Sequence, residues 1–189
     1  ENAYLGFYEC IDDQNVAAFL FSKAQEYAQK KGYHHIIGPV DGSFWNKYRL
    51  KINLFDKRPY TGEPYNKAYY YKQFTDNGYS VCEHYVSSIY DSFDKEYKNE
   101  KYMARYQSFI NNGYEIKKLD INDFDRTIEE LYHLLTRLYA DFPMYKHISK
   151  DDFISTFSGY KQILNTDMVR FAYYKSDMVG FFISVPDYG

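Results

Sequence analysis

Apolar and polar residues follow two different periods along the first 40 residues, and each period predicts a different element. Residues 3–11 (AYLGFYECI) are almost continuously apolar and aromatic, which predicts a buried strand. From 16 to 31 the apolar positions recur at helical spacing, and Gly32 ends this helix. The helix follows residues that can cap its first turn: Asp12, Asp13 and Asn15. A second strand-like stretch at 33–37 completes a strand, helix and strand, which predicts a parallel crossover.

The middle of the chain predicts a long loop, a short helix and a strand. Residues 41–65 contain two glycines and two prolines among scattered aromatic residues, so we expect an ordered loop there. A helix follows from Asn66, which can act as its N-cap, to Asn77, and a glycine stops it. Residues 79–90 alternate in part between apolar and polar side chains and predict a strand.

The remaining residues predict a connecting helix and a second unit. Residues 91–113 are polar and charged, with apolar positions at helical spacing, and join a unit at 1–90 to a unit at 114–189. The second unit begins with a strand at 114–119, followed by a helix that Asp120 or Asn122 begins and Pro143 breaks. A Ser149–Asp152 capping box opens a further helix, which continues to Leu164. The unit ends in a hairpin that turns at Lys175, Ser176 and Asp177.

The composition adds one anomaly to this ordinary globular pattern. Aromatic residues make up 21% of the chain, with 24 Tyr and 15 Phe. Two interpretations are open: the codon usage of an AT-rich bacterial genome, or a binding surface that tyrosine lines. The three consecutive tyrosines of GEPYNKAYYY make this choice relevant to function.

Charge and cysteine usage narrow the range of partners and compartments. The net charge is -3, and neither half of the chain has an excess of basic residues, so we expect no nucleic-acid partner. No apolar run approaches the length of a membrane span, so we expect no membrane partner. Cys10 and Cys82 lie far apart in strand-like apolar runs and read as free thiols, which favours the reducing cytoplasm. The first residues are strand-like rather than typical of a signal peptide, so this sequence can be a fragment of a longer chain.

The order of the elements resembles the GNAT (acyl-CoA N-acyltransferase) superfamily with its C-terminal half first. The hairpin carrying MVGFFIS is similar to the second and third GNAT strands, and residues 3–37 are similar to the fourth strand, cofactor-facing helix and fifth strand. IIGPVDGSFW and GEPYNKAYYY resemble an uncharacterised bacterial branch in which two such domains lie in tandem. The resemblance implies an α/β (α+β) fold with a mixed, mainly antiparallel central sheet flanked by helices.

This order implies a division of the chain and a pairing of its strands. Residues 1–90 correspond to a C-terminal GNAT half, 91–113 to a connecting helix and 114–189 to an N-terminal half. The chain is then either a fragment of a tandem protein or one permuted sheet. The edge strand at 178–185 needs a partner, and we expect residues 3–11 to supply it, within the chain or by strand exchange in a homodimer.

In GNAT enzymes the turn after the fourth strand binds the cofactor pyrophosphate through backbone amides at a helix N-terminus. The corresponding cofactor-binding residues here are Gln14, Asn15 and Val16, for acetyl-CoA or another acyl-CoA. The turn contains no glycine, and Asp12 and Asp13 stand where a phosphate would approach. The stretch is therefore either a cofactor site or a well-capped structural helix.

The usual GNAT acid is a tyrosine, and its position here is occupied by Phe74. Tyr70 and Tyr71 are the candidate catalytic acids in its place, because helical spacing puts both on the side of Phe74, with Tyr69 and Gln73 pointing away. The candidate substrate-binding residues lie in or beside the predicted loop: Trp45, Arg49 and Asn66. His34 and His35 face opposite sides of a strand, so we expect no metal site.

The resemblance implies transfer of an acyl group from acyl-CoA to the amine of a small molecule or peptide. The backbone of residues 7–10 would polarise the thioester carbonyl. Two alternatives stay open: a non-catalytic ligand- or protein-binding module that has lost the cofactor loop, and an aminoacyl-transferring relative of the cell-wall bridge-forming enzymes.

Overall fold

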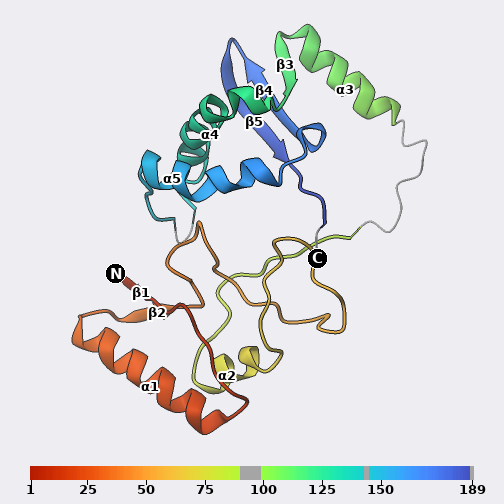
Figure 1. Ribbon diagram of the computed structural model, residues 1–189. Coiled ribbons are helices and arrows are strands. Elements are labelled where there is room, and N and C mark those ends of the chain that lie inside the picture. The colour runs from red at the N-terminus through yellow and green to blue at the C-terminus, as the bar shows by residue number, and fades with distance from the viewer. Residues whose placement is uncertain (90–98, 143–144, 188–189) are drawn as a thin grey trace. The chain divides into compact units, whose positions relative to one another are not determined.

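The computed structural model describes residues 1–89, 99–142 and 145–187, and it divides into two compact units (Figure 1). Unit 1 is Glu1–Tyr85 with Asp187, and unit 2 is Val86–Pro186. Both units combine helices and strands, and unit 2 contains an antiparallel three-stranded sheet, so the predicted α/β (α+β) class is confirmed. The assignment of 1–90, 91–113 and 114–189 to GNAT halves and a connecting helix stays a prediction.

Unit 1 begins with the predicted parallel crossover. Strand β1 (Asn2–Tyr4) pairs in parallel with β2 (His35–Ile37), and helix α1 (Gln14–Lys30) connects them (Figure 1). The side chain of Asp13 caps α1 by accepting hydrogen bonds from two backbone N–H groups of the first turn. Gly32 follows the helix with a φ of 82°, a conformation that glycine adopts without steric cost.

The predicted first strand is too long. Two further backbone bonds extend the pairing of β1, from Leu5 N–H to the Ile37 carbonyl (2.9 Å) and from Val40 N–H to the Leu5 carbonyl (2.8 Å). The chain then turns at Phe7, whose φ is 54°. Residues 8–11 therefore leave the sheet, although their apolar pattern is that of a strand.

The second helix of unit 1, α2 (Tyr70–Asp76), begins later than predicted. Asn66 does not cap it, because its side-chain amide forms hydrogen bonds with both the N–H and the carbonyl of Lys51, at 2.8 and 3.1 Å. The predicted end is confirmed, since Gly78 follows with a φ of 86°. The predicted loop is also confirmed, because 41–65 contains no helix or strand beyond an isolated bridge.

The strand predicted at 79–90 is absent from residues 79–89, and residue 90 lies outside the described residues. Val86 is 89% exposed and Ile89 is 70% exposed, so no neighbouring strand among the described residues covers these side chains. A partly alternating pattern forms a strand only where a partner completes the hydrogen-bond ladder.

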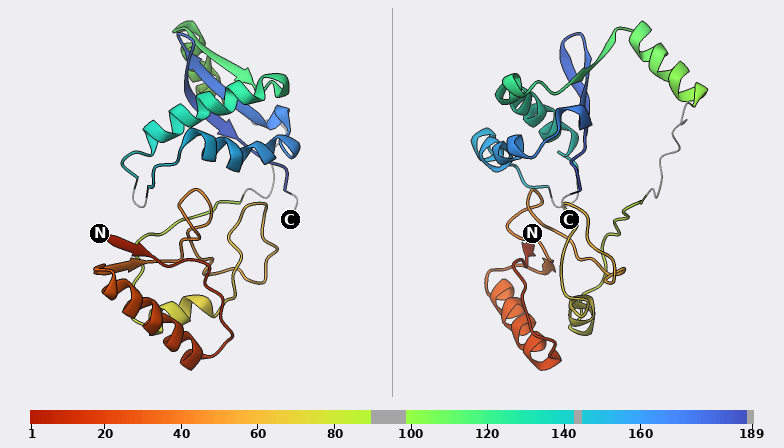
Figure 2. Two further views of the ribbon diagram at one scale, coloured as in Figure 1. Left: turned by 60° about the vertical axis from the view of Figure 1, so that its left-hand side comes forward. Right: turned by 45° about the vertical axis from the view of Figure 1, so that its right-hand side comes forward.

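Unit 2 is built on the antiparallel sheet β3-β4-β5, formed by β3 (Tyr114–Lys118), β4 (Val169–Tyr174) and β5 (Asp177–Ile183). The predicted hairpin between β4 and β5 is confirmed, and positive φ angles at Lys175 and Ser176 make its turn. Helices α4 (Phe124–Leu138) and α5 (Lys150–Phe157) lie side by side on one face of the sheet (Figure 2). Short 3-10 helices complete the unit: Ile121–Asp123, Ser158–Gln162 and Thr166–Met168.

The caps predicted for these helices are confirmed. Asp120 caps the 3-10 turn that leads into α4, and Ser149 Oγ accepts a hydrogen bond from Asp152 N–H at 3.1 Å at the start of α5. Helix α5 is shorter than predicted and continues as a 3-10 turn. Pro143, the predicted end of the preceding helix, lies outside the described residues.

Helix α3 (Glu100–Asn111) covers the part of the predicted connecting helix that the structure describes, since 91–98 lies outside it. It packs against β3, with the Phe109 and Tyr114 rings 5.1 Å apart at an interplanar angle of 89°. The described part of this helix lies within unit 2, and its role as a connector stays a prediction.

Residues 3–11 and the strand β5 do not share a sheet within the described chain, because β1 pairs with β2 and β5 pairs with β4. The expected intrachain pairing is therefore wrong. The physical reason is that Phe7 turns the chain after Leu5, which leaves only a short edge at β1. Strand exchange between two copies stays a prediction.

In the part of the chain that the structure describes, no helix combines the length and apolar character needed to cross a bilayer.

Candidate functional site

A pocket of about 150 Å³ opens in unit 1 between α2, the turn after β1 and the long loop. It brings together three of the predicted site residues, Tyr70, Arg49 and Asn66. The remaining lining residues are Phe7, Tyr8, Glu9, Pro39, Asp41, Lys47, Leu50 and Tyr65.

Tyr70 is the most buried of the predicted site residues in this pocket, with 3% of its surface exposed. Its hydroxyl donates a hydrogen bond to the Glu9 carboxylate at 2.5 Å and accepts one from the Cys10 N–H at 3.3 Å. Burial, followed by the bond to Glu9, raises the pKa of Tyr70 to about 12. The hydroxyl therefore holds its proton more firmly than a free phenol does.

Side chains of α2 and of its N-cap residue hold residues 8–11, the segment that leaves the sheet after β1. Tyr69 donates a hydrogen bond to the Cys10 carbonyl at 3.0 Å, and Gln73 donates one to the Ile11 carbonyl at 2.8 Å. Tyr8 donates to the amide oxygen of Gln73 at 2.8 Å, and burial raises the pKa of its phenol. These bonds replace the strand ladder predicted for residues 8–11.

The predicted orientation of the tyrosines is wrong for two of them. Tyr71 is 39% exposed and does not line the pocket, whereas Tyr69 points inward to the Cys10 carbonyl. Gln73, predicted to face outward, is 0% exposed. Tyr69 and Gln73 lie one helical turn apart and share a side, as predicted, but that side faces the carbonyls of residues 10 and 11, and the buried stripe follows the spacing of Tyr70, Gln73 and Phe74.

Arg49 lies in the pocket against two aromatic rings. Its guanidinium carbon is 5.6 Å from the centre of the Tyr48 ring and 5.4 Å from that of Tyr85. At this distance the face of each ring attracts the positive charge of the guanidinium. Asn66 also lines the pocket, but its amide holds the main chain of Lys51, so it shapes the wall by fixing the loop.

Trp45 does not line this pocket. Its ring lies 5.0 Å from the Phe44 ring in an edge-on arrangement, and the backbone N–H of Trp45 donates to Ser43 Oγ at 3.2 Å. Trp45 is thus part of the packing within the long loop, and its predicted contact with a substrate stays untested.

The predicted cofactor-binding residues Gln14, Asn15 and Val16 form the first turn of α1. Asp13 Oδ1 accepts hydrogen bonds from Asn15 N–H at 2.7 Å and from Val16 N–H at 3.2 Å. A phosphate that used these amides would have to displace the carboxylate. The geometry is that of a capped helix, and cofactor binding at this turn stays a prediction.

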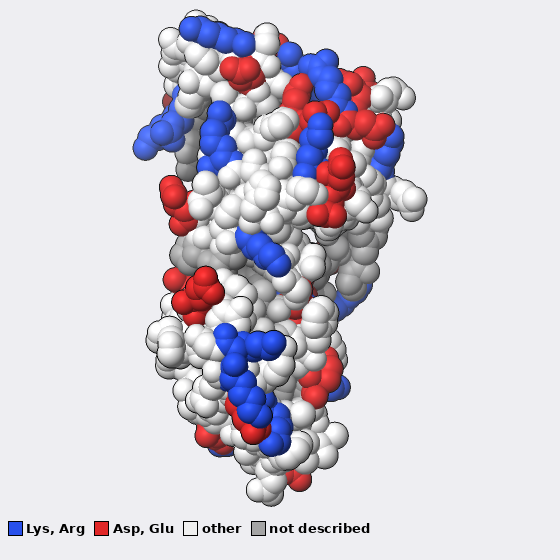
Figure 3. Space-filling model, turned by 90° about the vertical axis from the view of Figure 1, so that its left-hand side faces the viewer, with Lys and Arg blue, Asp and Glu red and all other residues white. Residues whose placement is uncertain are grey.

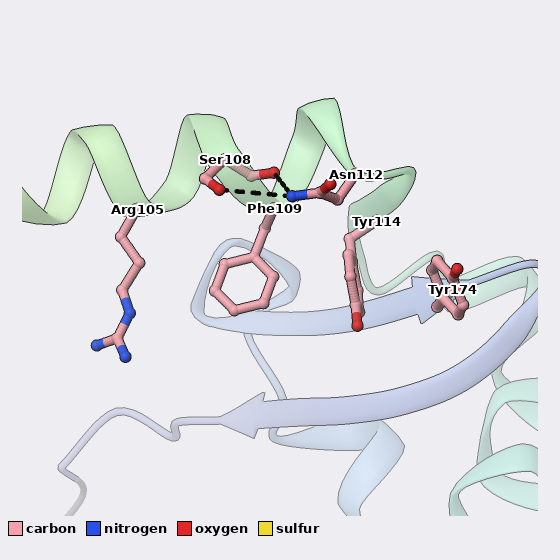
Figure 4. Close-up of a pocket in the computed structure, with 6 residues that line it drawn as sticks. All are labelled: Arg105, Ser108, Phe109, Asn112, Tyr114 and Tyr174. Atoms are coloured by element: carbon pink, nitrogen blue, oxygen red, sulfur yellow. Dashed lines mark hydrogen bonds between the residues drawn. The ribbon is translucent and has the colours of Figure 1, made fainter.

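Unit 2 contains a larger and more open pocket of about 470 Å³ beside α3, which holds none of the predicted site residues. Figure 4 shows Arg105 and Phe109 extending from one side of α3, with the Tyr114 ring beside Phe109. Its polar lining is partly used internally, since Asn112 Nδ2 donates to the Ser108 carbonyl at 2.7 Å.

The residue that sequence reasoning missed is Glu9. It is the one charged residue in the apolar run 3–11, and the structure places it beside Tyr70 in the pocket. A single carboxylate inside an apolar strand pattern is a signal that the sequence did contain.

The charges outside the pocket are mixed. On the face that Figure 3 shows, basic and acidic side chains are interspersed in each unit. Exposed ion pairs occur in both units, such as Lys23 with Glu26 on α1 and Lys118 with Asp167 in unit 2.

Comparison with known proteins gives one weak but long similarity. No family model matches the chain, and no solved structure matches it. The chain is 19% identical over 186 residues to a protein named bacterial ceramide synthase from Caulobacter vibrioides (strain NA1000 / CB15N). The match covers 98% of this chain and 48% of that protein, so the chain spans about half the length of this curated relative. These comparisons do not confirm the GNAT resemblance.

Proposed function

We propose that this chain contributes to an N-acyltransferase, which moves an acyl group from a thioester to an amine. The observation that carries the proposal is the similarity along 98% of the chain to a protein named ceramide synthase. A ceramide is the amide of a fatty acid and an amino alcohol, so its synthesis joins an acyl group to an amine. The pocket of unit 1 supports the proposal, because it holds a carboxylate beside a buried phenol.

Glu9 is the proton acceptor in this proposal. In neutral solution an amine is present mainly as an ammonium ion, and it must lose a proton before it can attack a carbonyl carbon. The new N–C bond forms as the C–S bond of the thioester breaks. Of the two protons that the ammonium loses, one goes to Glu9 and then to solvent, and the other ends on the released thiol.

Tyr70 acts as a positioning residue for Glu9. Its hydroxyl already donates to the Glu9 carboxylate, and a phenol with a pKa near 12 gives its proton to a thiolate less readily than an unperturbed phenol. The role of acid predicted for Tyr70 is therefore the less favoured one, and that of Tyr71, outside the pocket lining, stays a prediction.

The acyl donor of this proposal is acetyl-CoA or another acyl-CoA. Binding of its pyrophosphate at the first turn of α1 would require the Asp13 carboxylate to leave the Asn15 and Val16 amides. This observation favours a second candidate function, a non-catalytic module that keeps the pocket and binds a ligand without CoA.

Release of free thiol from acyl-CoA thioesters in the presence of amines tests the proposal. We expect Glu9→Gln to lower the rate about a hundredfold or more, the usual contribution of a general base. Glu26→Gln is the matched control, because Glu26 lies in an exposed ion-pair network on α1. If the wild type releases no thiol with any donor and amine pair but still binds amines, the chain is a binding module.

The role of Tyr70 is resolved by changing the leaving group. If Tyr70 positions Glu9, Tyr70→Phe should slow transfer equally from thioesters of alkyl thiols and of more acidic aryl thiols. If Tyr70 is the acid, the loss should be large for the alkyl thiol and small for the aryl thiol, whose thiolate needs no proton to leave.

A further inference from the structure

The charged side chains that line the pocket of unit 1 fall into two sets. Asp41 and Lys47 form an ion pair at 4.0 Å, and Asp41 also accepts a hydrogen bond from the Phe7 N–H at 2.6 Å. These two charges therefore compensate each other within the protein.

Glu9 and Arg49 make up the second set, and neither has an oppositely charged partner among the described residues. Glu9 accepts its hydrogen bond from the neutral hydroxyl of Tyr70. Arg49 lies against the neutral rings of Tyr48 and Tyr85. The pocket thus presents one carboxylate and one guanidinium whose charges are left for a ligand.

We infer that this pocket binds a zwitterion, a small α-amino acid whose ammonium group lies at Glu9 and whose carboxylate lies at Arg49. The inference rests on the proposed function for one step, that the bound amine is the acyl acceptor. A guanidinium binds a carboxylate through two parallel hydrogen bonds, and its contacts with aromatic rings hold it in a fixed orientation. The pocket of about 150 Å³ suits a small ligand.

A plain amino alcohol would use this pocket less completely. The ammonium group of an amino alcohol could reach Glu9. The ligand carries no carboxylate, however, so it would shield Arg49 from water without pairing the charge of the guanidinium. A buried or partly buried charge left unpaired costs binding free energy. The presence of a carboxylate on the amine is therefore the feature that the experiment should vary.

Three matched probes separate the two charges by calorimetric titration of the wild-type protein. Serine carries both groups, ethanolamine lacks the carboxylate, and 3-hydroxypropanoate lacks the amine. We expect serine to bind at least about tenfold more tightly than either, the effect of one charge-assisted hydrogen-bonded contact. Equal binding of serine and ethanolamine would overturn the inference.

Variants assign each charge to its residue. Arg49→Gln should weaken serine binding about tenfold and leave ethanolamine binding unchanged, whereas Glu9→Gln should weaken the binding of both amines and leave that of 3-hydroxypropanoate unchanged.

Arg58→Gln is the control, since Arg58 is an exposed cation of the same loop outside the pocket lining. Arg49→Lys keeps the positive charge, so it shows whether a loss in Arg49→Gln comes from the charge or from disturbed packing. An Arg49→Gln protein with an intact circular dichroism spectrum and unchanged serine affinity would also contradict the inference.

Thiol release with the same probes separates this inference from the proposed function. Serine bound selectively but never acylated would mean that the pocket is a zwitterion site and that the proposed transfer is wrong. Acylation of ethanolamine as fast as serine would mean that transfer is right and that the zwitterion inference is wrong.

Discussion

At the scale of single residues, tyrosine fills positions in unit 1 that aliphatic side chains occupy in most cores. The buried cluster of Ala17, Phe21 and Phe74 is surrounded by aromatic rings, with Tyr8 stacked on Phe21 at 5.0 Å and Tyr79 at 5.1 Å from the same ring. A phenol in such a place needs a partner for its hydroxyl. Tyr8 and Tyr70 have partners in Gln73 and Glu9, so their rings pack and their hydroxyls fix the site.

Tyr79 is the exception in this cluster. Its hydroxyl oxygen is buried and has no hydrogen-bond partner among the described residues, and burial raises its pKa. Tyr79→Phe removes an unsatisfied polar atom and keeps the ring, so we expect the free energy of unfolding to rise by about 1 kcal/mol. Urea unfolding measures this change.

Tyr8→Phe is the matched comparison for Tyr79→Phe. It removes a hydroxyl that is bonded and leaves the buried Gln73 amide without this partner, so it should lower stability by about 1 to 3 kcal/mol. A destabilisation of the same size in both variants would show that the Tyr79 hydroxyl has a partner in solution.

Gly6 is required by a close approach of two backbone segments. A Cβ at this position would lie 2.0 Å from the carbonyl oxygen of Val40, which is backbone and cannot move aside alone. We expect Gly6→Ala to separate residues 5–7 from Val40 and to destabilise unit 1 by about 3 kcal/mol or more. Thermal unfolding followed by circular dichroism measures it. Gly159→Ala is the control, because a Cβ there would meet no atom within 4 Å, and a similar loss in that variant would contradict the explanation.

At the scale of elements, features fixed by near neighbours could be predicted and features fixed by distant partners could not. The caps of Asp13 and Ser149 and the stop at Gly32 depend on residues within one turn, and the sequence predicted all of them. The strands at 3–11 and 79–90 depend on partners far along the chain. Only residues 3–5 of the first run pair with another strand, and residues 79–89 contain no strand, because strand formation is decided by pairing rather than by local preference.

The candidate site shows the same limit. Tyr70, Arg49 and Asn66, chosen from their places in loops and on a short helix, line one pocket, and their role as site residues stays a prediction. The direction of Tyr69 and the contact of Glu9 with Tyr70 could not be predicted, since both follow from hydrogen bonds between segments about 60 residues apart.

The first turn of α1 can be tested as a phosphate site without losing its cap. Serine at the N-cap position accepts the same backbone bonds as aspartate but carries no charge. We therefore expect Asp12→Ser with Asp13→Ser to leave the unfolding free energy within about 0.5 kcal/mol. The same variant should tighten acyl-CoA binding roughly fivefold for each charge removed, if the pyrophosphate lies at Gln14, Asn15 and Val16. Calorimetric titration with acetyl-CoA measures this affinity.

The control for this variant is Asp56→Ser, which removes an exposed loop carboxylate of the same unit. Identical acetyl-CoA affinity in the wild type, the double variant and the control would assign the first turn of α1 a structural role only.

At the scale of the whole molecule, each unit contains a tyrosine whose hydroxyl donates a hydrogen bond to a glutamate, buried in unit 1 and half-buried in unit 2. Tyr70 donates to Glu9 in unit 1, and Tyr173 donates to Glu130 at 2.8 Å in unit 2. Burial, followed by the glutamate, raises the pKa of both phenols to about 12. The same arrangement therefore links the stability of both units to alkaline pH.

The direction of this dependence follows from proton binding. In the unfolded chain a tyrosine loses its proton near pH 10, whereas folded Tyr70 and Tyr173 keep theirs up to about pH 12. Between these values the unfolded state binds fewer protons than the folded state, so stability falls as pH rises. The stabilisation is fully present below pH 10, and each tyrosine loses roughly 2 kcal/mol of it by pH 12.

Urea unfolding at pH 8, 10 and 11 should show a slope of the unfolding free energy against pH that Tyr70→Phe and Tyr173→Phe each reduce. Tyr27→Phe, on a ring that is 66% exposed, should leave the slope as in the wild type. An unchanged slope in the Tyr70→Phe, Tyr173→Phe double variant would mean that these phenols do not set the alkaline limit of the fold.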